Sequence, residues 1–145
     1  MTAKKISIVA VTIIIACTYY LFVKKYLLAT NFIGIVLQTL SIALIAWSRF
    51  TFGIRSFHAA ANTTKGKLVT TGPYKWLRHP VYAGGFYFIW TGIAFHFNFF
   101  SIIAGTLLTI AIVCRIIAEE FYLKKTYANY TIYMQTTKRL IPFIF

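Results

Sequence analysis

Three long stretches of this chain carry no charged side chain. They cover residues 6–23, 31–48 and 80–114 and consist mostly of aliphatic and aromatic residues. A helix needs about 20 apolar residues to cross a bilayer, and its backbone groups must bond within the segment. The third stretch is too long for one helix, and we expect a break at His-Phe-Asn, residues 96–98. The sequence therefore predicts an all-α integral membrane bundle with four transmembrane helices, near residues 6–23, 31–50, 81–95 and 99–117.

The basic residues indicate how such a bundle is oriented. All of the 15 lysines and arginines except Lys24 and Lys25 fall at the N-terminus, between residues 49 and 78, or from Arg115 onward. With four crossings these segments share one side, and the positive-inside rule places that side, with both termini, in the cytoplasm. A bacterial inner membrane and the endoplasmic reticulum both fit. A cleaved signal peptide is the alternative for the first stretch, but the apolar run continues to Val23 and ends at a basic pair, as a retained anchor does.

Acidic side chains are almost absent. Glu119 and Glu120 are the only two, and 12% of the residues are charged, against about 25% in soluble domains. This composition excludes a paired-carboxylate glycosidase and a multi-carboxylate metal cage. Cys17 and Cys114 lie in apolar runs, so we expect neither a disulfide framework nor a metal site. Bases that flank apolar runs are typical of membrane proteins and argue against a nucleic-acid partner.

The length predicts a single domain, residues 1–145. Two segments outside the apolar stretches lie on its expected cytoplasmic side and can carry a site. Residues 51–80 are polar and punctuated by glycine and proline, which predicts a loop, and loops of this length are usually functional. The tail, residues 118–145, predicts an interfacial helix with tyrosines at headgroup depth. The residues that define its apolar face are Leu123, Tyr127, Tyr130 and Met134.

Several short motifs cluster in the second half of the chain. Residues 78–84 read RHPVYAG and are preceded at 68–74 by LVTTGPY. Residues 115–123 read RIIAEEFYL, and the chain closes with two tyrosines spaced Y-x-x-Y from 130 and with RLIP at 139–142. Across residues 49–142 the chain resembles the isoprenylcysteine carboxyl methyltransferase family, whose motifs are RHPxYxG and RxxxEExxL. That family has no Rossmann domain, and no GxGxxG occurs here.

The resemblance implies an integral membrane enzyme that transfers a methyl group from S-adenosylmethionine. Relatives act on isoprenylcysteine carboxylates, phospholipid amines or small thiols, so a carboxylate, a thiol or another lipid-borne acceptor stays open. Methyl transfer is an in-line displacement that requires positioning and charge management, which a chain with two acids can provide. A carboxylate needs no base, whereas an amine or thiol must lose a proton. Apart from His79 and the two glutamates, the sequence offers no clear side chain to act as a general base, which favours a carboxylate or an ionised thiol as acceptor.

The resemblance also assigns residues to the site. It places Arg115 against the substrate and Glu119 against the cofactor, where a carboxylate can pair with an ammonium group or accept ribose hydroxyls. His79 is a second catalytic candidate, because Pro80 biases it away from helix and places it at a helix N-terminus that tolerates a carboxylate. The implied cofactor-binding set is Lys67, Leu68, Val69, Tyr74, His79, Pro80, Val81, Tyr82, Gly84, Glu119 and Glu120.

Some of these residues have a structural interpretation as well. Residues four apart share a helix face, so Glu119 can pair with Arg115 and Glu120 with Lys124. We expect Arg78 to be a positive-inside anchor. Gly84 permits close approach of either a cofactor or a neighbouring helix, and the sequence does not separate these.

The chain departs from the family pattern at two points. Gly66 stands where many relatives have a polar side chain, and the spacing between Leu123 and Tyr130 is one residue short. His58 and His96 match no motif, and we interpret His96 as a polar break between helices. Two other functions remain as alternatives: a non-catalytic membrane scaffold of the same fold, and a small four-helix transporter. The transporter would need an intramembrane acid, and Glu119 lies at a span boundary.

Overall fold

The computed structural model describes residues 3–53 and 68–145. Within these ranges the chain forms five α-helices and a short 3-10 helix, and its only extended pairing is a single parallel bridge. The elements are α1 (Ala3–Val23), α2 (Phe32–Phe52), η2 (Gly72–Lys75), α3 (Pro80–Phe95), α4 (Phe99–Thr126) and α5 (Tyr130–Thr136). The prediction of an all-α protein is confirmed.

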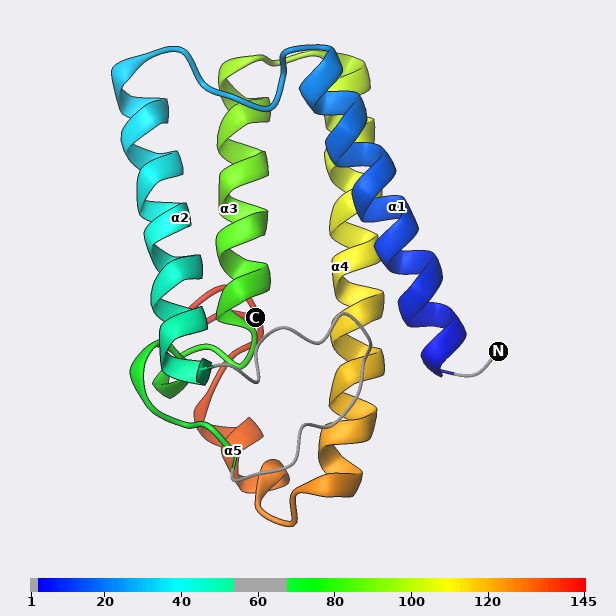
Figure 1. The fold of residues 1–145 in the computed structure, drawn as a ribbon, viewed down its shortest axis with the longest axis vertical. Coiled ribbons are helices and arrows are strands. Elements are labelled where there is room, and N and C mark those ends of the chain that lie inside the picture. The colour runs from blue at the N-terminus through cyan, green and yellow to red at the C-terminus, as the bar shows by residue number, and fades with distance from the viewer. Residues whose placement is uncertain (1–2, 54–67) are drawn as a thin grey trace.

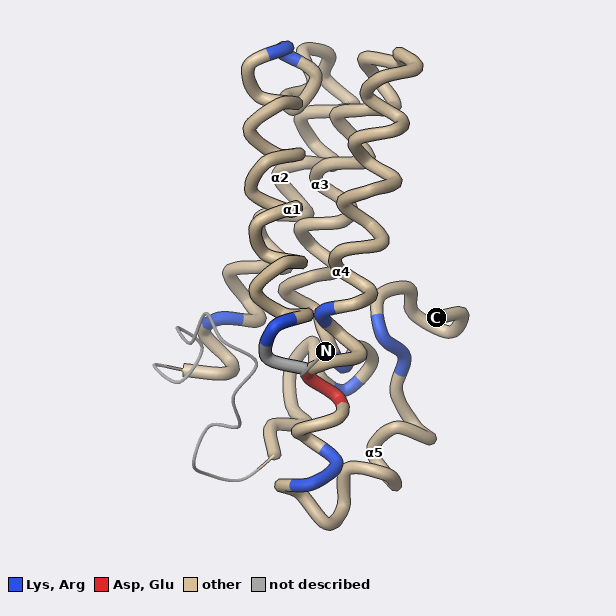
Figure 2. Tube along the Cα trace, turned by 90° about the vertical axis from the view of Figure 1, so that its right-hand side faces the viewer, with Lys and Arg blue, Asp and Glu red and all other residues tan. Residues whose placement is uncertain are grey.

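Helices α1 to α4 lie side by side along the long axis of the molecule (Figure 1). α1 packs mainly on α4, and α2 packs mainly on α3, while α3 and α4 join the two pairs. The connections 24–31 and 96–98 lie at one end of the bundle, and α5 lies at the other (Figure 1). Among the described residues, lysines and arginines gather at the α5 end together with the two glutamates (Figure 2). The α1–α2 connection, which carries Lys24 and Lys25, lies at the opposite end (Figure 1).

Three helices are long and apolar enough to cross a membrane. They contain the segments Lys5–Val23, Phe32–Phe52 and Phe99–Thr126. α3 is as apolar as the others but has 16 residues, about 24 Å at 1.5 Å per residue, whereas the hydrocarbon core is about 30 Å thick. Length and composition thus support three of the four predicted crossings, and α3 falls short by itself.

Asparagine caps and proline define where the helices begin. The Asn31 side chain accepts a hydrogen bond from the Gly34 N–H at 2.7 Å, and Asn98 forms a capping box with Ser101. Both arrangements satisfy N–H groups that a helix start leaves unpaired. The predicted break at residues 96–98 is therefore correct. His96 does more than interrupt a helix, because its Nε2 lies 2.8 Å from the Leu28 carbonyl and ties the two connections together.

A buried glutamine and a glycine hold α2 and α3 to the α1–α2 connection. Gln38 donates to the carbonyls of Leu27 (2.7 Å) and Phe88 (3.1 Å) and accepts from the Ala29 N–H (3.0 Å). A Cβ at Gly92 would lie 2.2 Å from the Leu27 carbonyl oxygen, so this close approach requires glycine. Polar bonds of this kind fix helix register where apolar surface alone does not.

The end of α4 and the tail differ from the prediction. α4 continues beyond residue 117 to Thr126, so both glutamates lie on it, and the tail helix starts only at Tyr130. The expected continuous apolar face through Tyr127 is wrong, since the chain turns at 127–129. Tyr130 and Tyr133 are buried because they pack against the rest of the protein instead of facing headgroups, and the Tyr133 hydroxyl donates to the Tyr74 carbonyl at 2.7 Å.

Candidate active site

The two motif segments that are far apart in sequence meet at the charged end of the bundle. The start of α3 brings His79 and Tyr82 to the same level as Arg115, Glu119 and Glu120 on α4. Pro80 occupies the first turn of α3, where its missing N–H costs nothing. This end also receives the tail, because residue 77 pairs with residue 138 in the parallel bridge.

Glu119 is held from two helices. The Tyr82 hydroxyl on α3 donates to Oε1 of Glu119, and Arg115 Nε lies 3.3 Å from the same oxygen, one turn earlier on α4. Arg115 Nε also donates to the Tyr82 hydroxyl. The Arg115–Glu119 pair expected from sequence is therefore present. The Glu119 side chain keeps 21% of its surface exposed, so its carboxylate is both oriented and reachable.

His79 lies between the two carboxylates. Its Nδ1 is 3.7 Å from Oε2 of Glu119, and its Nε2 is 3.5 Å from Oε1 of Glu120. Both separations are longer than the 2.7–3.2 Å of an N–H···O hydrogen bond. The imidazole is buried, and its Nε2 makes no hydrogen bond with any described residue. His79 thus lies beside both glutamates without a direct hydrogen bond to either.

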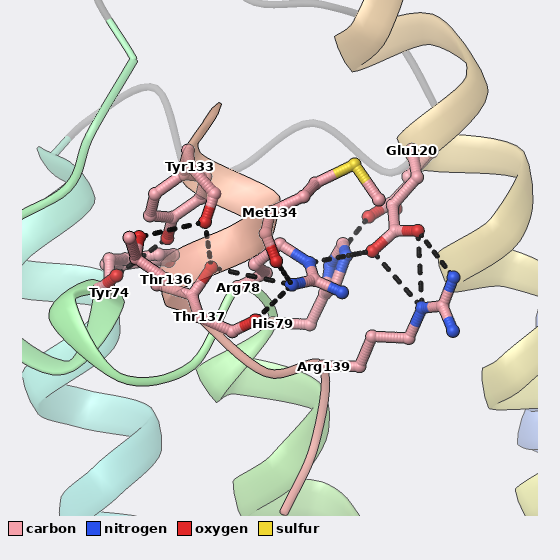
Figure 3. A network of polar contacts seen from close by, with 10 residues as sticks. Tyr74, Arg78, His79, Glu120, Tyr133, Met134, Thr136, Thr137 and Arg139 are labelled. Carbon is pink, nitrogen blue, oxygen red and sulfur yellow. Dashed lines mark hydrogen bonds and ion pairs between the residues drawn. The ribbon is translucent and has the colours of Figure 1, made fainter. Parts of the chain in front are cut away.

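Glu120 is buried and clamped by two arginines (Figure 3). Arg78 Nε donates to it at 3.0 Å, and Arg139 donates through Nη2 at 2.9 Å and Nε at 3.2 Å. The alternative pairing with Lys124 does not form, because the side chain turns inward to the loop and tail, and Lys124 is exposed. Glu120 therefore joins three segments that lie far apart in sequence.

Arg78 is not the membrane anchor expected from sequence. Its side chain is 7% exposed, and besides Glu120 it donates to the carbonyls of Met134 (3.0 Å) and Thr137 (Figure 3). These carbonyls belong to the end of α5, where a helix leaves its last acceptors unpaired and favours a cation. The Arg78 N–H also donates to the Lys138 carbonyl at 2.7 Å. Arg78 thus fixes the tail against the start of α3.

Ser7 is a site neighbour that sequence reasoning missed. Its Oγ accepts a hydrogen bond of 2.9 Å from Nη1 of Arg115, and both residues are buried. Ser7 belongs to α1 and lies in none of the motifs, which begin after residue 49. No local signal marks this serine, because its partner is 108 residues away.

A group of tyrosines surrounds the glutamates. Burial raises the pKa of Tyr74 to about 12, with Arg49 opposing and Glu119 adding to the rise. Burial also raises the pKa of Tyr130, and the Glu120 charge adds to this effect. These hydroxyls therefore stay protonated at neutral pH. The buried Tyr130 Oη, like His79 Nε2, has no hydrogen-bond partner among the described residues.

The remaining predicted residues fall into three groups. Leu68 and Val69 are half-buried in the segment before η2, Pro80 is buried and Val81 is half-buried at the start of α3. Gly84 faces α2, where a Cβ would lie 2.5 Å from Ile45 Cγ1 and 2.8 Å from the Ser41 carbonyl oxygen. Close packing of α3 on α2 therefore accounts for a glycine at this position. Lys67, Gly66 and His58 lie outside the described residues.

An apolar cavity of about 320 Å³ lies apart from these charges, between α2, η2, α3 and the tail. Its lining residues are Leu44, Trp47, Pro73, Trp76, Leu77, Tyr87, Pro142 and Phe143. None of the charged site residues contributes to it.

A family comparison agrees with the resemblance in the motifs. The family model described as phospholipid methyltransferase matches residues 29–130, which is more than half of the chain. The chain belongs to the phospholipid methyltransferase family. This family of integral membrane methyltransferases is related to the isoprenylcysteine carboxyl methyltransferases, so the relationship inferred from the motifs is confirmed. The matched segment covers α2, η2, α3 and α4 and leaves out α1 and most of the tail. No curated protein and no solved structure matched the chain.

Proposed function

We propose that this phospholipid methyltransferase family member transfers a methyl group from S-adenosylmethionine to a lipid-borne acceptor at the membrane surface. One observation carries the proposal. The RHPVY and RIIAEE segments converge, so that Tyr82, Arg115 and Glu119 form one hydrogen-bonded cluster with His79 beside it. A positioned, partly exposed carboxylate in a protein with only two acidic side chains is suited to a cationic ligand.

The residues at this end fit S-adenosylmethionine chemically. Glu119 supplies acceptor oxygens for an ammonium group or for ribose hydroxyls. The buried atoms His79 Nε2 and Tyr130 Oη make no hydrogen bond with a described residue, although His79 Nε2 lies 3.5 Å from Oε1 of Glu120, and buried polar atoms usually have a hydrogen-bond partner. A polar ligand that reaches these atoms would satisfy them. When bound, S-adenosylmethionine supplies an electrophilic methyl group on a sulfonium.

The chain's own residues orient the Glu119 carboxylate. Arg115 and Tyr82 both contact Oε1 of Glu119, which leaves the carboxylate little rotational freedom before any ligand arrives. Preorganised charge of this kind acts without reorganisation during the reaction. Glu120 is paired with Arg78 and Arg139, and we assign it to holding the tail over the site. In this role Glu120 acts on the tail and not as a cofactor ligand.

The acceptor determines whether a base is needed. A phospholipid amine must lose a proton before or during attack, whereas a carboxylate does not. His79, between Glu119 and Glu120, is the group we propose to take that proton. The family description names phospholipids, so an amine phospholipid is the first acceptor to test, followed by a prenylcysteine carboxylate and an alkyl thiol.

We propose four membrane crossings with both termini on the cytoplasmic side. Apart from the connection that carries Lys24 and Lys25, the described lysines and arginines lie with the site at one end of the bundle (Figure 2), and the positive-inside rule would place that end in the cytoplasm. α3 is shorter than the hydrocarbon core, and local thinning of the bilayer can accommodate a short crossing. α3 also packs between α2 and α4.

A transfer assay tests this function. The purified protein in detergent receives S-adenosylmethionine labelled in the methyl group, together with vesicles of phosphatidylethanolamine, a prenylcysteine or an alkyl thiol. We expect label in one lipid-borne product and none with Glu119→Gln. Folded protein that labels none of the three and binds no S-adenosylhomocysteine would instead indicate a scaffold.

A further inference from the structure

α1 is not part of the segment that the family model matches, yet it touches the candidate active site. The matched residues begin at 29, and α1 spans Ala3–Val23. Ser7 on α1 is 2% exposed, Arg115 on α4 is 6% exposed, and the Ser7 hydroxyl accepts a 2.9 Å hydrogen bond from Nη1 of Arg115. The contact is thus buried between two helices.

The spacing of α1 shows that Ser7 lies on its packing face. Buried or half-buried residues recur along α1 at intervals of three and four, and α1 packs on α4. This interval is typical of a helix–helix seam. The seam residues are Ser7, Ala10, Ile14, Cys17 and Leu21. Ser7 is the one hydroxyl residue of this seam and occurs at the level of Arg115.

A charged guanidinium at this depth needs partners at both ends. At the Nε end, Arg115 contacts Tyr82 and Glu119. At the Nη1 end, it donates to Ser7. Because the guanidinium is planar and rigid, fixing Nη1 fixes the plane in which Nε meets the other two groups. Loss of the Ser7 oxygen would leave a buried charged donor without this acceptor, which is costly.

We propose that Ser7 is a positioning residue of the methyltransferase site, and that α1 therefore forms part of the site. Ser7 acts through Arg115: it sets the guanidinium plane and thereby the orientation of Tyr82 and Glu119. This inference rests on the proposed function, because it assumes that this cluster binds the cofactor. The match to the family model does not imply this role, because the matched segment does not include α1.

Three variants test the proposal. Ser7→Ala removes the acceptor, Ser7→Thr keeps a hydroxyl, and Ser48→Ala is the control. Ser48 is also buried in an apolar helix, but its hydroxyl donates to the Leu44 carbonyl of its own helix at 2.6 Å. Calorimetric titration of S-adenosylhomocysteine into full-length protein in detergent measures the Kd, and thermal unfolding of each variant reports its stability.

We expect Ser7→Ala to raise the Kd about tenfold, as loss of one hydrogen bond to a charged group predicts. Ser7→Thr should restore most of the affinity, and Ser48→Ala should leave it unchanged. An unchanged Kd for Ser7→Ala would overturn the proposal. It would also be overturned if Ser7→Thr were as stable as the wild type and yet bound no better than Ser7→Ala.

A spectroscopic measurement separates this proposal from the proposed function. Nitrogen-15 spectra of labelled arginine, with Arg115→Lys to assign the resonance, report the guanidinium directly. If the wild type bound no S-adenosylhomocysteine, the proposed function would fail. A shifted and broadened Arg115 signal in Ser7→Ala but not in Ser7→Thr would still support the positioning role, and an unchanged signal would contradict it.

Discussion

The Tyr82 hydroxyl donates a hydrogen bond to Oε1 of Glu119 and so joins the start of α3 to α4. The same hydroxyl accepts from Arg115 Nε. Tyr82 is therefore a connecting group between the cation and the carboxylate, and it lies beside His79, with 5.8 Å between the ring centroids. The site depends on this contact between residues that are 37 positions apart.

Replacing Tyr82 by phenylalanine isolates the hydroxyl. Tyr82→Phe keeps the ring and removes one bond to the Glu119 carboxylate, which is worth about 1.5–3 kcal/mol for a charged partner. We expect at least a tenfold loss of S-adenosylhomocysteine affinity. The matched control is Tyr87→Phe on the same helix, whose hydroxyl donates to the Leu140 carbonyl at 2.6 Å away from the glutamates. Equal losses in both variants would argue against a specific role for Tyr82.

Glu120 should matter chiefly for stability. Glu120→Gln removes the charge that pairs with Arg78 and Arg139, and removing one partner of a buried ion pair costs about 3–5 kcal/mol. Arg139 is 29% exposed, so the lower end of this range applies. Thermal unfolding in detergent should show a clear fall in Tm. Lys124→Gln serves as the control and should leave the Tm unchanged. An equal fall in Tm for the two variants would indicate that Glu120 pairs with Lys124 and not with the arginines.

Adjacent glycines on α3 distinguish helix packing from ligand contact. A Cβ at Gly84 would meet Ile45 and the Ser41 carbonyl on α2, whereas a Cβ at Gly85 meets nothing within 4 Å. We expect Gly84→Ala to destabilise the protein by about 1–3 kcal/mol, as overpacking does, and Gly85→Ala to leave the Tm unchanged. If Gly84→Ala kept its Tm and lost S-adenosylhomocysteine affinity, Gly84 would belong to the cofactor site instead.

Much of the fold follows from local pattern, because uncharged runs and capping residues act over short distances. The four long helices lie where these runs predict them, and Asn98 begins α4 where a break was expected. The end of α4 was not predictable in this way. The packing of the tail was not predictable either, because the buried Tyr133 bonds to Tyr74, which lies 59 residues away.

In the candidate site, too, local contacts could be predicted from the sequence, whereas contacts between distant segments could not. The i, i+4 contact between Arg115 and Glu119 follows from helix geometry alone and is present in the structure. The partners of Glu120 could not be read in this way, because Arg78 lies 42 residues away and Arg139 belongs to the tail. The i, i+4 rule allowed a pair with Lys124, but the buried carboxylate is paired with the two arginines instead.

Binding of S-adenosylhomocysteine to wild-type protein and to Glu119→Gln tests the central claim most directly. Calorimetric titration in detergent, with matched thermal unfolding, gives both affinity and fold integrity. We expect saturable binding at one site by the wild type and a loss of tenfold or more for Glu119→Gln. The variant amide oxygen can still accept from Tyr82 and Arg115, so we expect a folded protein with a lower Tm, because buried Arg115 loses its counter-charge. Folded wild-type protein that binds no ligand, or a Glu119→Gln variant that binds as tightly as the wild type, would contradict the assignment of Glu119 to the cofactor.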